Sequence, residues 1–157
     1  MISAGEKPDL NFTVKAVING EEKELPFRKL LDRPAIVSVY MKNNTSSCDR
    51  QTKSLAEESA YFDELGYSII AISKDGCRSH KRYADKQGIN YILVSDPDYQ
   101  FANATDSIVE KKMYGKTFEG PSRSAFVLDE EGTVKGVIEK VDTKDHAGQL
   151  KSFLESL

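Results

Sequence analysis

The sequence has few of the residues from which metal sites and disulfide frameworks are built. Only two histidines, His80 and His146, and two cysteines, Cys48 and Cys77, occur among its 157 residues; no CxxC pair is present, and Cys77 and His80 form the one CxxH spacing. One such pair supplies too few ligands for a zinc site, and we expect neither a metal site nor a cofactor. Thiol–disulfide exchange of the CxxC type is not expected either. Two widely separated cysteines instead indicate free thiols or redox chemistry.

Features of membrane, secreted and nucleic-acid-binding proteins are also missing. No apolar run is long enough to span a bilayer, and residues 1–8 lack the basic start and apolar stretch of a signal peptide. The net charge is −3 and the Lys and Arg residues are scattered, so no basic face indicates nucleic acid. We therefore expect one soluble domain over residues 1–157, in the cytoplasm, without a membrane or nucleic-acid partner.

Alternating strand-like and helix-like patterns predict an α/β fold. Strand patterns occupy residues 10–25, as a hairpin around Asn19-Gly20, and residues 35–40, 67–73, 89–94, 124–128 and 133–138. Helical patterns run from about Cys48 to Gly66, from an N-cap at Asp75 to Gly88, and over residues 101–108 and 145–157, while residues 110–122 are expected to form a loop. This order favours a parallel core with right-handed crossovers. We expect a thioredoxin-like fold, in which helices flank a mixed central sheet that carries an N-terminal β-hairpin extension.

A nucleotide-binding sheet is the competing interpretation of this order. Residues 41–47, which follow the first core strand, contain no glycine, so the dinucleotide fingerprint and the phosphate loop are both absent. In open α/β sheets the functional site lies beyond the carboxyl ends of the parallel strands. Cys48 and Cys77 each follow such an end, which makes them the candidate site residues.

Cys48 lies where the first core strand gives way to a helix. Thr45 or Ser46 is a suitable N-cap, and with Thr45 as the cap Cys48 is the third helical residue. Unpaired N–H groups and the positive end of the helix dipole favour a thiolate at such a position. A small buried hydrophobic residue near a cap explains the stretch equally well, and the residues alone leave both interpretations open.

Several segments, in the same order along the chain, resemble the peroxiredoxins of the AhpC/TSA family. Thr45-Ser46-Ser47-Cys48 fits the TxxC motif of that family. Further segments resemble its bacterioferritin-comigratory-protein, or peroxiredoxin Q, branch: Ser73–His80, Ser95–Asp98, Met113–Lys116 and Arg123–Phe126. The resemblance runs from about residue 8 to the C-terminus.

The resemblance implies a thioredoxin fold and a thiol peroxidase that reduces hydrogen peroxide and organic hydroperoxides. Cys48 would be the peroxidatic cysteine, whose thiolate attacks the O–O bond and becomes a sulfenic acid. Thr45 would hydrogen-bond the thiolate and the peroxide, and Arg123 would stabilise the charge that moves from sulfur to oxygen. Met41 and Ser47 would contact the substrate. A thioredoxin-like reductant would complete the cycle, in a monomer or a homodimer.

Four features of the sequence affect this expectation. Met41 stands where the family usually has a proline, and Ser46 and Ser47 replace a common Pro-Gly. Asp49 adds a negative charge next to the cysteine, which should oppose thiolate formation slightly. Lys53 occupies the position, five residues after Cys48, at which many members of the branch carry a resolving cysteine.

Cys77 is then the internal candidate for resolving the sulfenic acid. The alternatives are that Cys77 packs as a buried helix residue and an external thiol resolves Cys48. His80 is expected to be a helix-face residue and not a catalytic base. Two other functions stay open: a redox sensor with poor turnover, and a non-enzymatic interaction module of the same fold.

Overall fold

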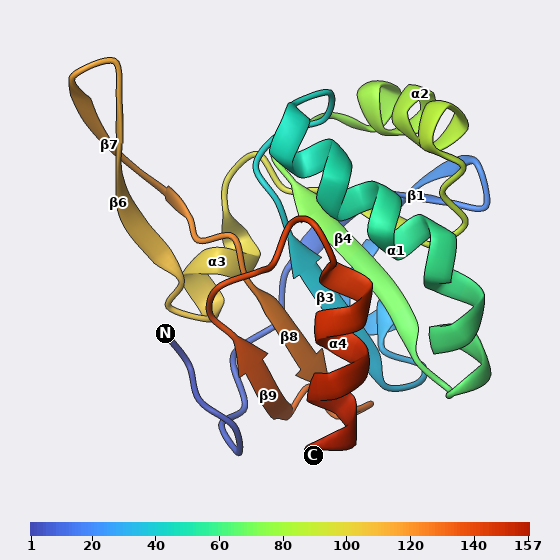
Figure 1. Ribbon diagram of the computed structural model, residues 1–157. Helices are drawn as coiled ribbons and strands as arrows, with labels where there is room; N and C mark the ends of the chain where they lie inside the picture. Colours follow the sequence, from blue (N-terminus) through green and yellow to red (C-terminus); the bar gives the residue numbers. More distant parts are fainter.

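The computed structural model describes residues 1–157, and a seven-stranded mixed sheet forms its centre (Figure 1). The strand order is β2-β1-β5-β4-β3-β8-β9. The central three strands are parallel and the others are antiparallel to their neighbours. The strands are β1 (Thr13–Ile18), β2 (Glu21–Pro26), β3 (Ala35–Val39), β4 (Ser68–Ser73), β5 (Ile92–Ser95), β8 (Ala125–Leu128) and β9 (Val134–Ile138).

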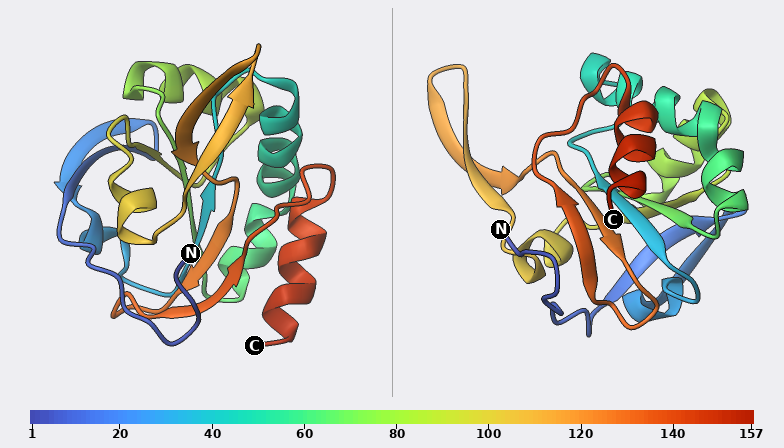
Figure 2. Two further views of the ribbon diagram at one scale, coloured as in Figure 1. Left: turned by 90° about the vertical axis from the view of Figure 1, so that its left-hand side faces the viewer. Right: turned by 60° about the horizontal axis from the view of Figure 1, so that its bottom comes forward.

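Helices cover both faces of this sheet. α1 (Ser46–Glu64), α2 (Cys77–Gln87) and α4 (His146–Glu155) pack on one face. The short α3 (Gln100–Ala104) and the 3-10 helix η1 (Phe27–Leu30) pack on the other, and Figure 2 shows α3 across the sheet from α1 and α4. All five residues of β3 are buried, as expected for a central strand with helices on both faces. None of the helices combines the length and apolar character needed to cross a membrane.

The predicted N-terminal hairpin is confirmed, because β1 pairs with β2 across Asn19-Gly20. Both turn residues have positive φ, 50° and 79°, which suits the right-handed twist of the two strands. α3 begins at Gln100, one residue before the predicted helix over residues 101–108. The Asp96 carboxylate accepts hydrogen bonds from the backbone N–H groups of Gln100 (2.9 Å) and Phe101 (3.0 Å).

The prediction of a loop over residues 110–122 is wrong. β6 (Ile108–Met113) and β7 (Lys116–Pro121) form a two-stranded sheet that projects from the body of the molecule (Figure 1). Tyr114 and Gly115 have φ values of 52° and 74°, the conformation of a tight hairpin turn. The strands bury little of either face, so no hydrophobic alternation marks them in the sequence. The predicted helix over 101–108 accordingly ends at Ala104.

Candidate active site

The backbone around Cys48 follows the prediction, but the predicted cap contact differs. Thr45 is the N-cap of α1, in extended conformation, and Cys48 is the third residue of the helix. The Thr45 side chain makes no capping bond to the helix. Its hydroxyl donates instead to the carbonyl of Lys42 at 2.8 Å, which ties the cap to the loop after β3. The thiol is buried, with a side chain that is 1% exposed.

Arg123 reaches Cys48 because of the register between β3 and β8. The N–H of Val39 donates to the carbonyl of Ser124 at 2.9 Å, which places Arg123 beside the carboxyl end of β3, where the loop to Cys48 begins. Arg123 Nη1 donates to Cys48 Sγ at 3.2 Å. The structure thus brings together the two residues that the resemblance assigned to the site.

Gln51 is a site residue that the sequence reasoning missed. It lies one helical turn after Cys48, and its Oε1 accepts a hydrogen bond from Arg123 Nη1 at 2.8 Å. One nitrogen of the guanidinium therefore contacts both the sulfur and the amide. The sequence signal was the i, i+3 spacing from Cys48, which places both side chains on the same face of the helix.

These surroundings lower the pKa of the Cys48 thiol. Burial alone would raise that pKa, because it disfavours the charged form. The neighbouring Thr45 side chain and the backbone of Lys42 and Met41, together with the charge of Arg123, outweigh the burial. The site therefore favours a buried thiolate, which is the nucleophilic form of cysteine.

The loop that leads to Cys48 is fastened to α2 by polar contacts. The N–H of Asn43 donates to Asp75 Oδ2 at 2.9 Å, and the Asn43 amide lies 3.1 Å from His80 Nδ1. The predicted N-cap role of Asp75 is wrong, because Gly76 occupies the N-cap position of α2. The Asp75 carboxylate is engaged by the Ser73 hydroxyl (2.7 Å) and by the loop. His80 is fully buried on α2 and lies 3.1 Å from the Val94 carbonyl.

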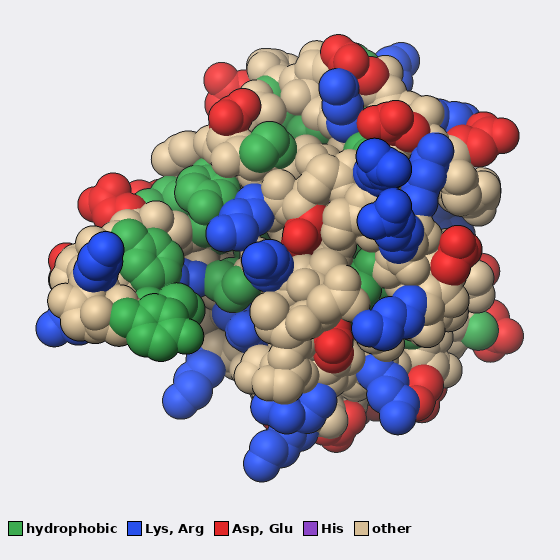
Figure 3. All heavy atoms as spheres, turned by 90° about the horizontal axis from the view of Figure 1, so that it is seen from above, with side chains coloured by type: hydrophobic (Ala, Val, Ile, Leu, Met, Phe, Trp, Pro, Cys, Tyr) green, Lys and Arg blue, Asp and Glu red, His purple; other side chains and the backbone are tan.

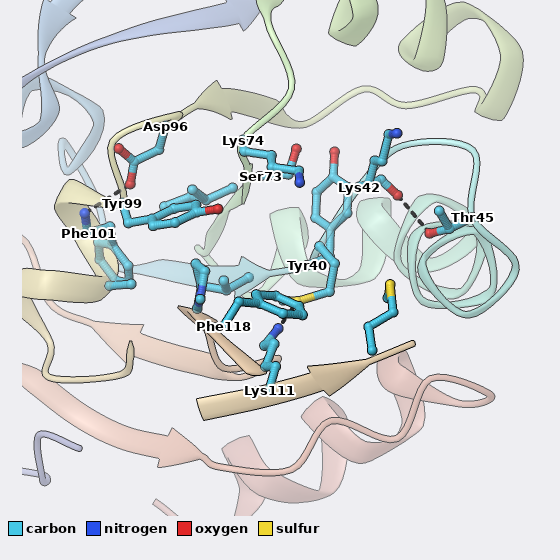
Figure 4. A pocket seen from close by; sticks show the side chains of 17 residues that line it. Tyr40, Lys42, Thr45, Ser73, Lys74, Asp96, Tyr99, Phe101, Lys111 and Phe118 are labelled. Atoms are coloured by element: carbon cyan, nitrogen blue, oxygen red, sulfur yellow. Dashed lines mark hydrogen bonds between the residues drawn. The ribbon is translucent and has the colours of Figure 1, made fainter. Parts of the chain in front are cut away.

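A cavity of about 370 Å³ opens beside Thr45 (Figure 4). Its lining combines apolar and aromatic side chains with lysines; among them are Met41, Tyr99, Phe101, Met113, Phe118, Lys42, Lys74 and Lys111. Lys111 and Phe118 extend to it from the β6–β7 hairpin, and the Lys111 ammonium contacts the Met41 sulfur. Apolar and basic side chains lie next to each other on this part of the surface (Figure 3). Ser47 does not line the cavity, and its hydroxyl accepts a hydrogen bond from Arg50 at 3.3 Å.

Cys77 and Asp49 have surroundings different from those of Cys48. Cys77 is the first residue of α2 and is a free, buried thiol. Burial and the neighbouring carboxylate of Glu22, on β2, raise the pKa of Cys77 to about 11.

Asp49 does not engage the thiol of Cys48, since its carboxylate accepts a hydrogen bond from the Tyr83 hydroxyl at 2.6 Å.

Comparisons with known proteins agree with this geometry. The model of the AhpC/TSA family matches residues 6–137. Peroxiredoxin Bcp of Xanthomonas campestris is 35% identical over 121 residues, which cover 77% of this chain and 76% of the relative. Peroxiredoxin Bcp of Bacillus subtilis is 29% identical over 122 residues, 78% of each chain.

Solved structures extend the similarity to the whole fold. The bacterioferritin comigratory protein of Xanthomonas campestris is 29% identical and superimposes with a TM-score of 0.85, covering 98% of both chains. Xanthomonas campestris peroxiredoxin Q gives the same TM-score and identity, over 98% of this chain and 97% of that chain. The predicted thioredoxin-like fold is confirmed. The chain therefore belongs to the AhpC/TSA family of peroxiredoxins, in its Bcp/PrxQ branch.

Proposed function

We propose that the protein reduces hydrogen peroxide and organic hydroperoxides at Cys48, in the following way. The thiolate attacks one peroxide oxygen, the O–O bond breaks, and Cys48 becomes a sulfenic acid. The other oxygen leaves with the electron pair of that bond and takes up a proton, as water or an alcohol. The observation that carries the proposal is the 3.2 Å contact between Arg123 Nη1 and Cys48 Sγ, since the same cation can stabilise the charge on sulfur before the attack and on oxygen during it.

Thr45 and Met41 have supporting roles in this reaction. The Thr45 hydroxyl borders the cavity and contributes to the lowered pKa of Cys48, so we assign it to holding the thiolate and the incoming peroxide. Met41 lines the cavity where the family usually has a proline. Its flexible thioether fills the wall of the site and contacts Lys111 from the hairpin.

The cavity supports organic hydroperoxides as substrates. Its lining has apolar walls that can bury an alkyl or aryl group beside Thr45. The Xanthomonas campestris bacterioferritin comigratory protein, which is similar in structure, has alkyl peroxide reduction activity.

Phe118→Ala is expected to slow the reaction with cumene hydroperoxide about 3- to 10-fold, because a large apolar contact with the substrate is lost. The rate constant with hydrogen peroxide, which is too small to reach that wall, should not change. Stopped-flow measurements with both peroxides check this expectation. An equal fall with both would show that Phe118 shapes the site and does not select the substrate.

Regeneration of Cys48 by an external thiol is the second half of the proposal. The external thiol condenses with the sulfenic acid to form a mixed disulfide and water, and a second thiol releases Cys48. A thioredoxin-like protein supplies both thiols. The surroundings of Cys77 favour this route over internal resolution, because a buried thiol with a pKa of about 11 is almost entirely protonated at neutral pH.

Cys77→Ser is accordingly expected to keep peroxide turnover within about twofold of the wild type, with dithiothreitol as the reductant. Turnover is read from peroxide consumption, and peptide mass spectrometry after one equivalent of peroxide should find no Cys48–Cys77 disulfide. A disulfide in the wild type, together with lost turnover in the variant, would assign the resolving role to Cys77.

Sustained turnover separates the enzyme from its two alternatives. With excess cumene hydroperoxide and dithiothreitol, we expect the wild type to consume many equivalents of peroxide per chain. Consumption that stops after one equivalent in the presence of reductant would indicate a redox sensor. No consumption at all would indicate an interaction module.

A further inference from the structure

A chain of buried and partly buried hydrogen bonds connects α4 to Arg123. It runs through four side chains that the peroxide reaction does not touch: Gln149, His146, Ser38 and Gln51. Ser38, Gln51 and His146 are each at most 1% exposed. They come from β3, α1 and α4, so the hydrogen-bond chain ties the active-site arginine to the C-terminal helix.

The outer end of this chain is oriented by the backbone. Gln149 Nε2 donates to the carbonyl of Lys140 at 2.9 Å, and Gln149 Oε1 accepts from the N–H of Asp142 at 2.9 Å. The amide group therefore has one orientation, with its oxygen on the side of His146. His146 Nδ1 lies 3.3 Å from that oxygen, so Nδ1 carries the hydrogen.

The next two bonds follow from the tautomer of His146. Burial lowers the pKa of His146 to about 4, so the ring is neutral at physiological pH and Nε2 is an acceptor. Ser38 Oγ lies 3.0 Å from Nε2 and donates its hydrogen there. Its lone pairs then accept from Gln51 Nε2 at 2.9 Å.

The inner end of the chain decides which atom of Gln51 faces the arginine. With Gln51 Nε2 held by Ser38 and by the Val39 carbonyl (3.4 Å), Oε1 faces Arg123 Nη1 at 2.8 Å. A flipped amide would present an NH₂ group to the guanidinium and repel it. We propose that His146 and Ser38 are positioning residues, which hold the Gln51 amide oriented so that Arg123 stays directed at the sulfur of Cys48.

Removing either residue should weaken the contact between Arg123 and Cys48. For Ser38→Ala and for His146→Leu we expect the pKa of Cys48 to rise and the rate constant with hydrogen peroxide to fall about fivefold, because one oriented hydrogen bond of the chain is lost. His146→Gln is the rescue variant, since a glutamine can place an acceptor near the position of Nε2. It should return both the pKa of Cys48 and the rate constant most of the way to their wild-type values.

The decisive experiment is a double-mutant cycle on the pKa of Cys48. That pKa is read from the pH dependence of alkylation by iodoacetamide, in a Cys77→Ser background, and does not require peroxidase activity. If Ser38 and His146 act through the same hydrogen-bond chain, the double variant Ser38→Ala/His146→Leu should raise the pKa of Cys48 no further than either single change. Effects that add, or an unchanged pKa in correctly folded Ser38→Ala, would overturn the proposal.

A matched control separates positioning from general stability. Leu150→Val also alters a fully buried side chain of α4, but outside the hydrogen-bond chain. It should lower the melting temperature and leave the pKa of Cys48 unchanged. If Leu150→Val raised the pKa of Cys48 as much as His146→Leu does, the packing of α4, and not the hydrogen-bond chain, would control the site. If the pKa results hold and no variant reduces peroxide, the proposed function fails while this inference stands.

Discussion

Cys48→Ser is expected to reduce peroxide consumption by at least about 1,000-fold, to the background of the reductant, as expected for the loss of a catalytic nucleophile. A serine hydroxyl stays protonated near neutral pH, whereas the buried site lowers the pKa of the Cys48 thiol. Consumption of hydrogen peroxide and cumene hydroperoxide, with dithiothreitol in excess, is the measurement.

Cys77→Ser is the matched control for this change. It makes the same replacement of sulfur by oxygen at the other buried cysteine and should retain turnover. If Cys48→Ser consumed peroxide as fast as the wild type, Cys48 would not be the nucleophile. A sensor that depends on oxidation of Cys48 would be ruled out as well.

Arg123→Ala is expected to slow the reaction with peroxide about 100-fold, the usual effect of losing a donor to the charge that develops in a transition state. The same change should raise the pKa of Cys48, because Arg123 is one of the groups that lower it. In the wild type, the rate should rise with pH as the thiolate forms and level off below the ordinary pKa of cysteine. In the variant, that rise should move to higher pH.

Arg123→Lys is the control that keeps the positive charge but changes the geometry of the hydrogen-bond donors. Lysine keeps the positive charge but lacks the planar fork that lets one guanidinium contact both Cys48 and Gln51. We expect a rate between those of the wild type and Arg123→Ala. A rate for Arg123→Ala equal to that of the wild type, at all pH values, would contradict the assigned role of the arginine.

The start of α1 was predictable from the sequence because its signals are local. Cys48 is placed within the first turn of the helix by three neighbouring features: a residue suited to an N-cap, the apolar strand before it and the helical pattern after it. The contact with Arg123 depends instead on the antiparallel pairing of β3 with β8. No local pattern encodes that pairing, so only the resemblance to the peroxiredoxins indicated this residue.

The hydrogen-bond chain from α4 to Arg123 could not be predicted from the sequence. Ser38 belongs to no distinctive motif, and His146 lies far from Cys48 in the sequence. Their roles arise from burial, which requires each polar group to find a partner in the interior. The β6–β7 hairpin escaped prediction for the opposite reason, since its strands are largely exposed and show no hydrophobic period.

Trapping of the oxidised cysteine is the sharpest test of Cys48 as the residue that attacks the peroxide. Reduced protein is treated with one equivalent of cumene hydroperoxide in the presence of dimedone, which adds to sulfenic acids, and its peptides are analysed by mass spectrometry. We expect a dimedone adduct on Cys48 and an unmodified thiol at Cys77. An unmodified Cys48 after the peroxide has been consumed, or an adduct confined to Cys77, would contradict this role of Cys48.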